Sequence, residues 1–369
     1  MKAPVITGSA AVTALGRTLL ETRAALAAGR SAIAPVEDGG EGAPKAADRS
    51  PAARIGPFTT EPELAKGKAR RLDRGSQYAV VAMRQLFVDA GYAMAGREER
   101  TGILLGTGSA GVGPLTEFER QMAVESPEAA SPFLFPNTVA NAPASQAAIE
   151  AGIKGPNVTV IQKDSAALNA LFYGRMLLAD GRADALVVGA ADEWNLVYHR
   201  AYEAVHATRT ARRPGFVLGE GAGVVLVEDE ASARARGARI DARVAGVSSR
   251  SSAFSPHVRR ADPKVLAAAI RDALAEAGIA RAEIGLIHLS KNGSPFTDAA
   301  EEVALHDVFG PSLPRTAAVK DSLGENPAIG AIQLALAAAE LRENPGVGAV
   351  LLDAFGAGGN ILAAVLTAP

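Results

Sequence analysis

The sequence predicts an α/β fold built from two similar halves, each of which alternates strands and helices. The chain has 369 residues, more than a usual single domain, and 48% of them are hydrophobic, enough for a large buried core. The predicted strands are apolar runs, as expected for sheets covered by helices on both faces. The order of elements begins again after a charged stretch at residues 234–239. We therefore expect an N-terminal half over residues 1–235 and a C-terminal half over residues 236–369.

The apolar periodicity of the chain places the individual elements. In the first half we expect strands over residues 4–8, 101–106, 158–161 and 184–193, and helices over about 18–28, 69–90, 114–124, 144–152 and 164–178. In the second half we expect strands over residues 240–247, 284–289, 349–352 and 361–366, and helices over 263–278, 299–309 and 328–341. Residues 36–60 are rich in Gly, Pro, Ala and charged residues without periodicity, which predicts a surface loop.

The composition argues against several classes of function. Because the chain contains no cysteine, disulfides, thiolate metal sites and thiol catalysis are excluded. The five histidines show no metal-ligand spacing, and we expect neither a metal nor a cofactor. A formal net charge of −2 gives no electrostatic reason to expect binding to nucleic acid or to an anionic membrane. No apolar run approaches the roughly 20 residues of a membrane span, and no signal-peptide pattern opens the chain, so we expect a cytoplasmic protein.

The segment at residues 155–171 is a short strand that turns sharply into a helix opening near Asp164. A side chain at such a turn points at the helix N-terminus, where free backbone N–H groups and the helix dipole favour negative charge. Enzymes use this geometry to hold a thiolate, but the residue here is an aspartate. The residues alone leave two interpretations: Asp164 caps the helix, or it occupies the position of a catalytic group.

Four stretches of the chain carry longer motifs. Residues 155–167 follow the pattern G-P-N-x-x-x-S-T-A-C-[AST]-[ST]-G, and residues 214–226 are close to D-G-F-V-x-G-E-G-A-G-x-x-x-L. Residues 5–16 and 355–360 resemble V-I-T-G-x-G-x-V-T-x-L-G and F-G-F-G-G-x-N, with Ala357 at the second phenylalanine. Together these stretches resemble the β-ketoacyl synthases of the thiolase superfamily, over essentially the full chain. The resemblance implies a thiolase-like fold, in which two duplicated βα halves pack as a layered α-β-α-β-α sandwich.

The resemblance also implies three reacting side chains, and all three are replaced. In the family a cysteine carries the acyl chain, and two histidines bind and polarise the malonyl thioester. Counting along the motifs puts Asp164 in the cysteine position, Ser290 in the position of the first histidine and Glu325 in that of the second. The lysine of the K-x-x-x-G-H motif is kept as Lys320, for which we expect a salt bridge to Asp164 or Glu325. We expect none of these residues to be catalytic in condensation.

A ketosynthase frame without its reagents resembles the chain length factors, the inactive partners of active ketosynthases in type II polyketide systems. We therefore predict a non-condensing subunit that forms a heterodimer with an active ketosynthase and shapes the acyl tunnel, with a polyene pathway as the first choice. Such a subunit is not an enzyme on its own. An acyl carrier protein would dock on the complex mainly through the partner. Known chain length factors often carry glutamine at the cysteine position, so Asp164 departs from that pattern too.

Two other functions remain open. In the first, Asp164, Glu325 and Ser290 perform acid–base chemistry on acyl-carrier substrates in a repurposed enzyme, because two carboxyl groups in a closed pocket can push their pKa values apart. In the second, the chain is a homodimeric acyl-binding scaffold.

Further candidate residues come from the resemblance. Apolar side chains near the expected dimer interface, with one residue of the F-G-F-G-G-x-N loop, are candidates for lining the acyl tunnel or the interface: Leu115, Phe118, Met122, Phe133, Phe135 and Ala357. A basic cluster near residue 70 is either a solvated helix face or part of a patch for an acidic carrier protein; it comprises Arg70, Arg71 and Arg74. His288 is expected to face the same side of its strand as Ser290, either packed there or brought near the site by a local shift.

Overall fold

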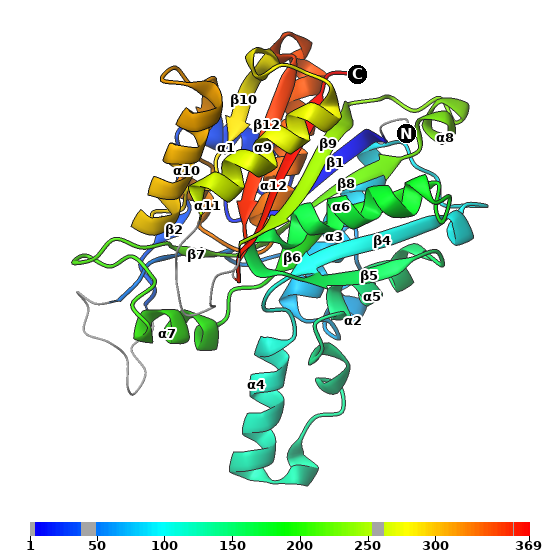
Figure 1. Ribbon diagram of the computed structural model, residues 1–369. Helices are drawn as coiled ribbons and strands as arrows, with labels where there is room; N and C mark the ends of the chain where they lie inside the picture. Colours follow the sequence, from blue (N-terminus) through cyan, green and yellow to red (C-terminus); the bar gives the residue numbers. More distant parts are fainter. Residues whose placement is uncertain (1–3, 38–48, 253–261, 357) are drawn as a thin grey trace.

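Ten strands form one central sheet in this computed structural model, which describes residues 4–37, 49–252, 262–356 and 358–369 (Figure 1). In sheet order they are β11 (Arg315–Ala317), β10 (Ile284–His288), β12 (Ala349–Phe355), β13 (Asn360–Thr367), β9 (Ala242–Ser251), β1 (Val5–Thr13), β8 (Gly221–Glu228), β6 (Ala185–Asp192), β4 (Thr101–Thr107) and β5 (Asn157–Ile161). A separate small sheet consists of β2 (Ile33–Ala34), β3 (Ala52–Ala53) and β7 (Leu218–Gly219).

The central sheet is a duplication of one five-stranded pattern. From one edge, β5, β4 and β6 run parallel, and β8 and then β1 follow in antiparallel pairing. From the other edge, β11, β10 and β12 run parallel, and β13 and β9 follow in the same antiparallel order. The two sets are joined where β1 pairs with β9, at Val5 with Arg243 and Ile6 with Ala242. The predicted duplication is therefore confirmed.

Helices cover the outer faces of both sets and fill the space between them. The middle layer consists of α6 (Ala166–Ala179) and α12 (Ile329–Glu343), which pack on each other and on strands of both sets. The outer layers consist of α3 (Arg74–Asp89) and α5 (Ala142–Ala151) on one side, and α9 (Pro263–Ala277) and α10 (Pro295–Phe309) on the other. Twelve of the fifteen residues of α12 are buried, as expected of a helix that is apolar on all sides. The layered α-β-α-β-α arrangement is confirmed.

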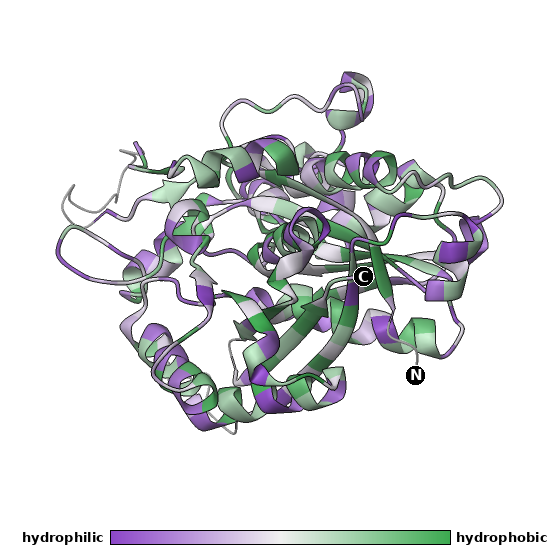
Figure 2. Cartoon of the chain, turned by 90° about the horizontal axis from the view of Figure 1, so that it is seen from above, coloured by the Kyte–Doolittle hydropathy of each residue, from purple (hydrophilic) through white to green (hydrophobic). Residues whose placement is uncertain are grey.

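The remaining elements are short or peripheral. The helices are α1 (Leu19–Ala27), α2 (Lys66–Ala69), α4 (Val112–Arg120), α7 (Leu196–Ala204), α8 (Glu230–Ala235) and α11 (Lys320–Leu323). Single turns are η2 (Glu98–Arg100), η3 (Gln121–Glu125), η4 (Pro127–Ala129), η5 (Phe135–Asn137), η6 (Lys163–Ser165), η7 (Arg281–Glu283) and η8 (Pro345–Val347). Hydrophobic residues gather on the central strands and hydrophilic ones on the surrounding helices and loops (Figure 2).

A glycine in β8 lets the middle layer lie directly against the sheet. A Cβ atom built on Gly223 would lie 2.4 Å from the backbone nitrogen of Ile332 in α12. No side chain fits at that distance, so the position of α12 depends on the absence of one. This glycine belongs to the G-E-G-A-G stretch recognised in the sequence, which gives that stretch a packing role.

The structure corrects several of the predicted elements. The surface loop predicted over residues 36–60 is wrong in part, because Ser50, Ala52 and Ala53 are buried and β3 pairs in the small sheet; residues 38–48 lie outside the described residues. The helix predicted over residues 69–90 is divided, since α2 ends at Ala69 and α3 begins after Asp73, whose side chain accepts a hydrogen bond from the Ser76 backbone (3.2 Å).

Two more differences bear on the site. The helix predicted over residues 114–124 begins at Val112 and ends as an α-helix at Arg120, after which η3 continues as a π-helical turn. The helix α7 was not predicted, because its hydrophobic residues carry no recognised motif. It places two tyrosines beside the cavity described below.

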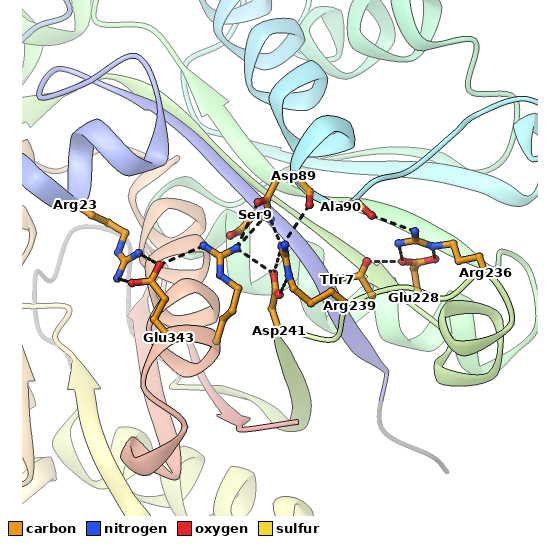
Figure 3. Close-up of polar contacts among 11 residues, drawn as sticks. Thr7, Ser9, Arg23, Asp89, Ala90, Glu228, Arg236, Arg239, Asp241 and Glu343 are labelled. Carbon is orange, nitrogen blue, oxygen red and sulfur yellow. Dashed lines mark hydrogen bonds and ion pairs between the residues drawn. The ribbon is translucent and has the colours of Figure 1, made fainter.

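Ion pairs hold the junction of the two sets together (Figure 3). The Asp241 side chain is fully buried just before β9, where Arg239 donates to it at 2.5 Å and Arg342 of α12 lies 3.6 Å away. Both arginines also contact Asp89 at the end of α3. Because burial raises the pKa of Asp241 while the two guanidiniums favour its charged form, the network keeps a buried charge compensated. The network joins the end of α3, the start of β9 and the end of α12, which are remote in sequence.

Candidate functional site

A cavity of about 360 Å³ lies at the carboxyl ends of parallel strands from both sets. Residues that follow β4, β5 and β6 contribute one side, and residues that follow β10 and β12 contribute the other. Open α/β sheets bind ligands at this end of their parallel strands. The polar lining residues include Ser109, Lys163, Asp164, Asp192, Glu193, Asn195, Asn292, Ser294, Glu325 and Asn326, and the aromatic ones are Trp194, Tyr198, Tyr202, Phe216 and Phe355.

Asp164 lines the cavity and does not cap a helix. The turn after β5 contains Lys163 at φ 46°, followed by the single turn η6, and no side chain caps either η6 or α6. The capping interpretation is therefore wrong. Burial, followed by the charge of the nearby Glu325, raises the pKa of Asp164 to about 7, although Lys320 and Lys163 oppose the shift.

Glu325 is held by one buried cation and one amide. The Lys320 Nζ atom donates to the Glu325 Oε2 atom at 2.8 Å, and the Asn292 Nδ2 atom donates to the same oxygen at 2.8 Å. The salt bridge expected for Lys320 thus goes to Glu325. Burial alone would lower the pKa of Lys320, but the Glu325 charge and hydrogen bond and the Asp164 charge raise it overall, so this lysine stays charged.

Ser290 faces away from the cavity. Its side chain is 1% exposed, and its Oγ atom donates to the Asp353 backbone oxygen at 2.8 Å. Its backbone nitrogen donates to Glu301 at 2.6 Å. Burial and the neighbouring Asp353 raise the pKa of Glu301, and burial raises the pKa of Asp353 to about 6. Ser290 is thus part of a buried polar cluster behind the site and not one of the residues that line it.

His288 lies in a different cavity from Asp164. It lines an apolar space of about 500 Å³ together with Leu286, Leu336 and α1. Burial lowers the pKa of His288 to about 4, so it is a neutral packed histidine. The strand β10 ends at His288, so its alternation of side chains does not extend to Ser290, which lines neither cavity.

Sequence reasoning assigned no role to the acidic pair Asp192 and Glu193 at the end of β6. Asp192 is buried and accepts hydrogen bonds from the Gly108 and Ser109 backbone nitrogens at 2.8 and 2.9 Å. Burial raises its pKa to about 6, and burial and neighbouring carboxylates raise the pKa of Glu193 to about 8. The only signal was their place at the end of the strand predicted over residues 184–193, and that place alone does not say where the two side chains point.

The candidate tunnel residues lie away from the cavity, on an arm formed by α4, η3, η4 and η5 that projects from the body (Figure 1). Leu115, Met122, Phe133 and Phe135 are exposed on this arm, by 38%, 41%, 72% and 62%. Phe118 is partly buried and stacks on Phe135, with ring centroids 5.7 Å apart. None of them lines the cavity within this chain. Ala357 lies outside the described residues.

The basic cluster near residue 70 is not a single surface. Arg74 donates to the Tyr78 hydroxyl at 2.8 Å and to the backbone oxygens of Ile55 and Gly56, so it fastens α3 to the chain that precedes it. Arg70 and Arg71 are exposed.

The raised pKa of Asp164 predicts a pH-dependent stability effect. The folded protein keeps a proton on Asp164 up to about pH 7, whereas the unfolded chain releases it near pH 4, so this group's contribution to stability is lost as pH rises between those values. We expect Asp164→Asn to be more stable than the wild type at pH 8, by on the order of 1 kcal/mol, and by less at pH 5. Urea unfolding at both pH values measures the difference. The exposed Asp180→Asn at the far end of α6 is the control, and an Asp164→Asn advantage that does not grow with pH would contradict the assignment.

The duplicated sheet, the shared middle layer and the cavity at the carboxyl ends of strands from both sets define a thiolase-like protein. Residues 2–233 match the family described as Beta-ketoacyl synthase, N-terminal domain, and residues 241–345 match Beta-ketoacyl synthase, C-terminal domain. The chain belongs to the β-ketoacyl synthase family, which confirms the resemblance seen in the sequence. No helix within the described residues has the length and apolar character needed to span a membrane.

Individual relatives are similar at moderate identity. A 3-oxoacyl-[acyl-carrier-protein] synthase 2 from Staphylococcus aureus is 29% identical over 269 residues, which cover 69% of this chain and 66%, just under two thirds, of the synthase. The structure described as the ishigamide ketosynthase/chain length factor aligns over 100% of both chains with a TM-score of 0.90 and 26% identity. A type II PKS acyl-carrier protein in complex with its ketosynthase aligns over 100% of both chains with a TM-score of 0.88 at 20% identity, a likeness of fold alone.

Proposed function

We propose that the chain is a chain length factor-like subunit, which does not condense acyl units itself but pairs with an active ketosynthase and forms part of the wall of its acyl tunnel. The observation that carries the proposal is the state of Glu325, which stands where the family motif has its second histidine. Its carboxylate is tied to Lys320 and Asn292 at 2.8 Å each, and among the described residues no imidazole lines the cavity beside Asp164.

The chemistry of the cavity argues in the same direction. An acyl group on Asp164 would be a mixed anhydride, which water cleaves readily. The carboxylates of Asp164 and Glu325 would repel the malonyl carboxylate that condensation has to bind. Ser290, in the position of the first histidine, donates its hydroxyl to Asp353 and does not line the cavity. The frame is kept without the groups that perform the reaction.

The projecting arm supports the need for a partner. Large apolar side chains are exposed along it, and an apolar patch of this kind on a soluble protein marks an interaction site. In order along the chain they are Leu115, Met122, Val124, Phe133, Phe135 and Val139. The partner we propose is an active ketosynthase, by analogy with the ketosynthase/chain length factor among the similar structures. An acyl carrier protein would then dock mainly on that partner.

One observation favours the second candidate, a repurposed enzyme. Burial and the neighbouring Glu325 raise the pKa of Asp164 to about 7, and a general base works best with a pKa near the operating pH. The version of this candidate that used Ser290 as a third group is not supported by the buried position of that serine. Turnover of acyl-carrier substrates by the isolated chain, lost in Asp164→Asn, would favour the enzyme. If the third candidate, a homodimeric scaffold, is right, the chain should form a stable homodimer that does not bind added ketosynthase.

Co-expression with an active ketosynthase of the same organism tests the proposal. We expect the two chains to co-purify and to extend an acyl-carrier substrate with malonyl units, with products read by mass spectrometry. The isolated chain should form no product, and neither should the pair when the partner lacks its nucleophilic cysteine. Condensation by the isolated chain, or by a pair whose partner lacks that cysteine, would refute the proposal.

A further inference from the structure

One oxygen in the cavity has no partner within the described residues. Glu325 is 4% exposed, and while its Oε2 atom accepts from Lys320 and Asn292, its Oε1 atom is buried without a hydrogen bond. An unsatisfied buried carboxylate oxygen is costly, so such an atom in a residue that lines a cavity points to a donor on a ligand. Asp164 lines the same cavity and contributes a second carboxyl group. The donor that suits two carboxyl groups best is a cation.

An aromatic wall stands in the same cavity. Tyr198 and Tyr202 come from α7, and Phe216 packs edge-on against Tyr202 with ring centroids 5.1 Å apart. The Lys163 Nζ atom lies 6.0 Å from the centroid of the Tyr202 ring. The wall therefore already accepts an alkylammonium group near its face, which is the geometry of a cation–π contact.

We infer that this cavity binds a primary ammonium group carried on an apolar, aromatic body. The ammonium donates to the free Oε1 atom of Glu325 and to the carboxylate of Asp164, and the body packs against Tyr198, Tyr202 and Phe216. The Nδ2 atom of Asn326 is also buried without a partner and lines the cavity, so it can donate to a hydroxyl or carbonyl oxygen on the same ligand. Ligands that end in a carboxylate are repelled.

The inference goes beyond the proposed function and depends on it only in that the cavity carries no acyl group on Asp164. The two can fail separately, because ligand binding is measured on the purified chain alone, whereas condensation is measured with the partner. A chain that binds amines and pairs with no ketosynthase would refute the proposed function only. A chain that supports a ketosynthase and binds no amine would refute this inference only.

Binding should strengthen as pH rises. The titratable and charged groups that line or adjoin the site are Asp164 and Lys163 at the turn after β5, Asp192 and Glu193 at the end of β6, Tyr198 and Tyr202 on α7, and Lys320 and Glu325 before α12. Burial raises the pKa of Asp164, Asp192 and Glu193 to about 7, 6 and 8, so all three gain negative charge between pH 6 and 8.5. An aliphatic amine stays protonated over this range. The affinity for an ammonium ligand therefore rises with pH over this interval.

Three probes of nearly equal size test the inference on the full chain by isothermal titration calorimetry at pH 8. We expect 2-phenylethylamine to bind, 2-phenylethanol to bind at least about tenfold more weakly, which is the value of one charge-assisted contact, and 3-phenylpropionate not to bind at the same concentrations. The amine's affinity should fall severalfold at pH 6. Equal binding of amine and carboxylate, or no binding of the amine, would overturn the inference.

The affinities of three variants for the amine test whether it binds in this cavity. Asp164→Asn should weaken the binding of 2-phenylethylamine roughly tenfold. Lys163→Met should strengthen the binding of the amine severalfold, because it removes the Lys163 ammonium group from the aromatic wall. The matched control is Asp180→Asn, which removes a carboxylate at the far end of α6, roughly 20 Å away along the helix, and should leave the affinity unchanged. An unchanged affinity in Asp164→Asn, or an equal loss in the control, would overturn the assignment.

Discussion

Replacing Lys320 by methionine is expected to lower the free energy of unfolding by about 3–5 kcal/mol. The side chains of Lys320 and Glu325 are each 5% exposed, and their charged atoms are 2.8 Å apart. Methionine fills the same volume but leaves the Glu325 carboxylate buried with Asn292 as its remaining donor, and it also removes the hydrogen bond from Lys320 to the Ser290 backbone oxygen (2.9 Å). Urea unfolding at pH 7 measures the loss.

The double variant Lys320→Met/Glu325→Gln separates the charge from the packing. When both charges are removed, no uncompensated ion remains, so at least half of the lost stability should return. A single variant that unfolds like the wild type, or a double variant no better than the single one, would show that the pair does not hold the site together.

Phe135→Asp is expected to abolish pairing with the ketosynthase while leaving the isolated chain folded. The Phe135 side chain is 62% exposed on the projecting arm, so its replacement should cost the isolated chain little stability. In the proposed interface, by contrast, the aspartate would bury a charge among apolar side chains and remove an aromatic contact. The affinity should fall by about 2 kcal/mol or more, which is roughly thirtyfold. Analytical ultracentrifugation of the mixed chains measures it.

Val88→Asp serves as the matched control for the arm. Val88 is 83% exposed at the end of α3, on the body of the protein and not on the arm. An aspartate there changes the surface charge equally and should leave pairing intact. If both variants pair normally, the arm is not the interface, and if both fail, the loss is a general effect of charge.

The layered fold was predictable from the sequence because its signals are repeated. Apolar strands recur in the same order in both halves, and glycine-rich motifs such as the one containing Gly223 mark where the backbone of α12 lies against β8. The positions of Asp164 and Glu325 were also reached by counting along motifs, since both turns lie at fixed places relative to their strands. Both residues line one cavity, as that counting implies.

The orientation of individual side chains was not predictable. The sequence allowed a salt bridge from Lys320 to either Asp164 or Glu325. Only the folded backbone decides between them, because it brings the Glu325 Oε2 atom to 2.8 Å from the Lys320 Nζ atom. Ser290 was placed in the site by its motif position, but it follows the end of β10 and turns into the polar cluster behind the cavity. The residue type of Asp164 allowed a helix cap as well as a site residue, whereas the turn at Lys163 places it in the lining of the cavity.

The shared middle layer has a consequence for how the chain is made. The helix α12 lies far along the chain from β1 and β8, yet it packs on both strands. The inner face of β1 and β8 therefore lacks this helix until residue 343 has been synthesised, whereas α6 can cover β4, β5 and β6 earlier. A nascent chain of this protein carries two apolar strands without their helix until α12 has left the ribosome, and the first set of strands completes its packing only then.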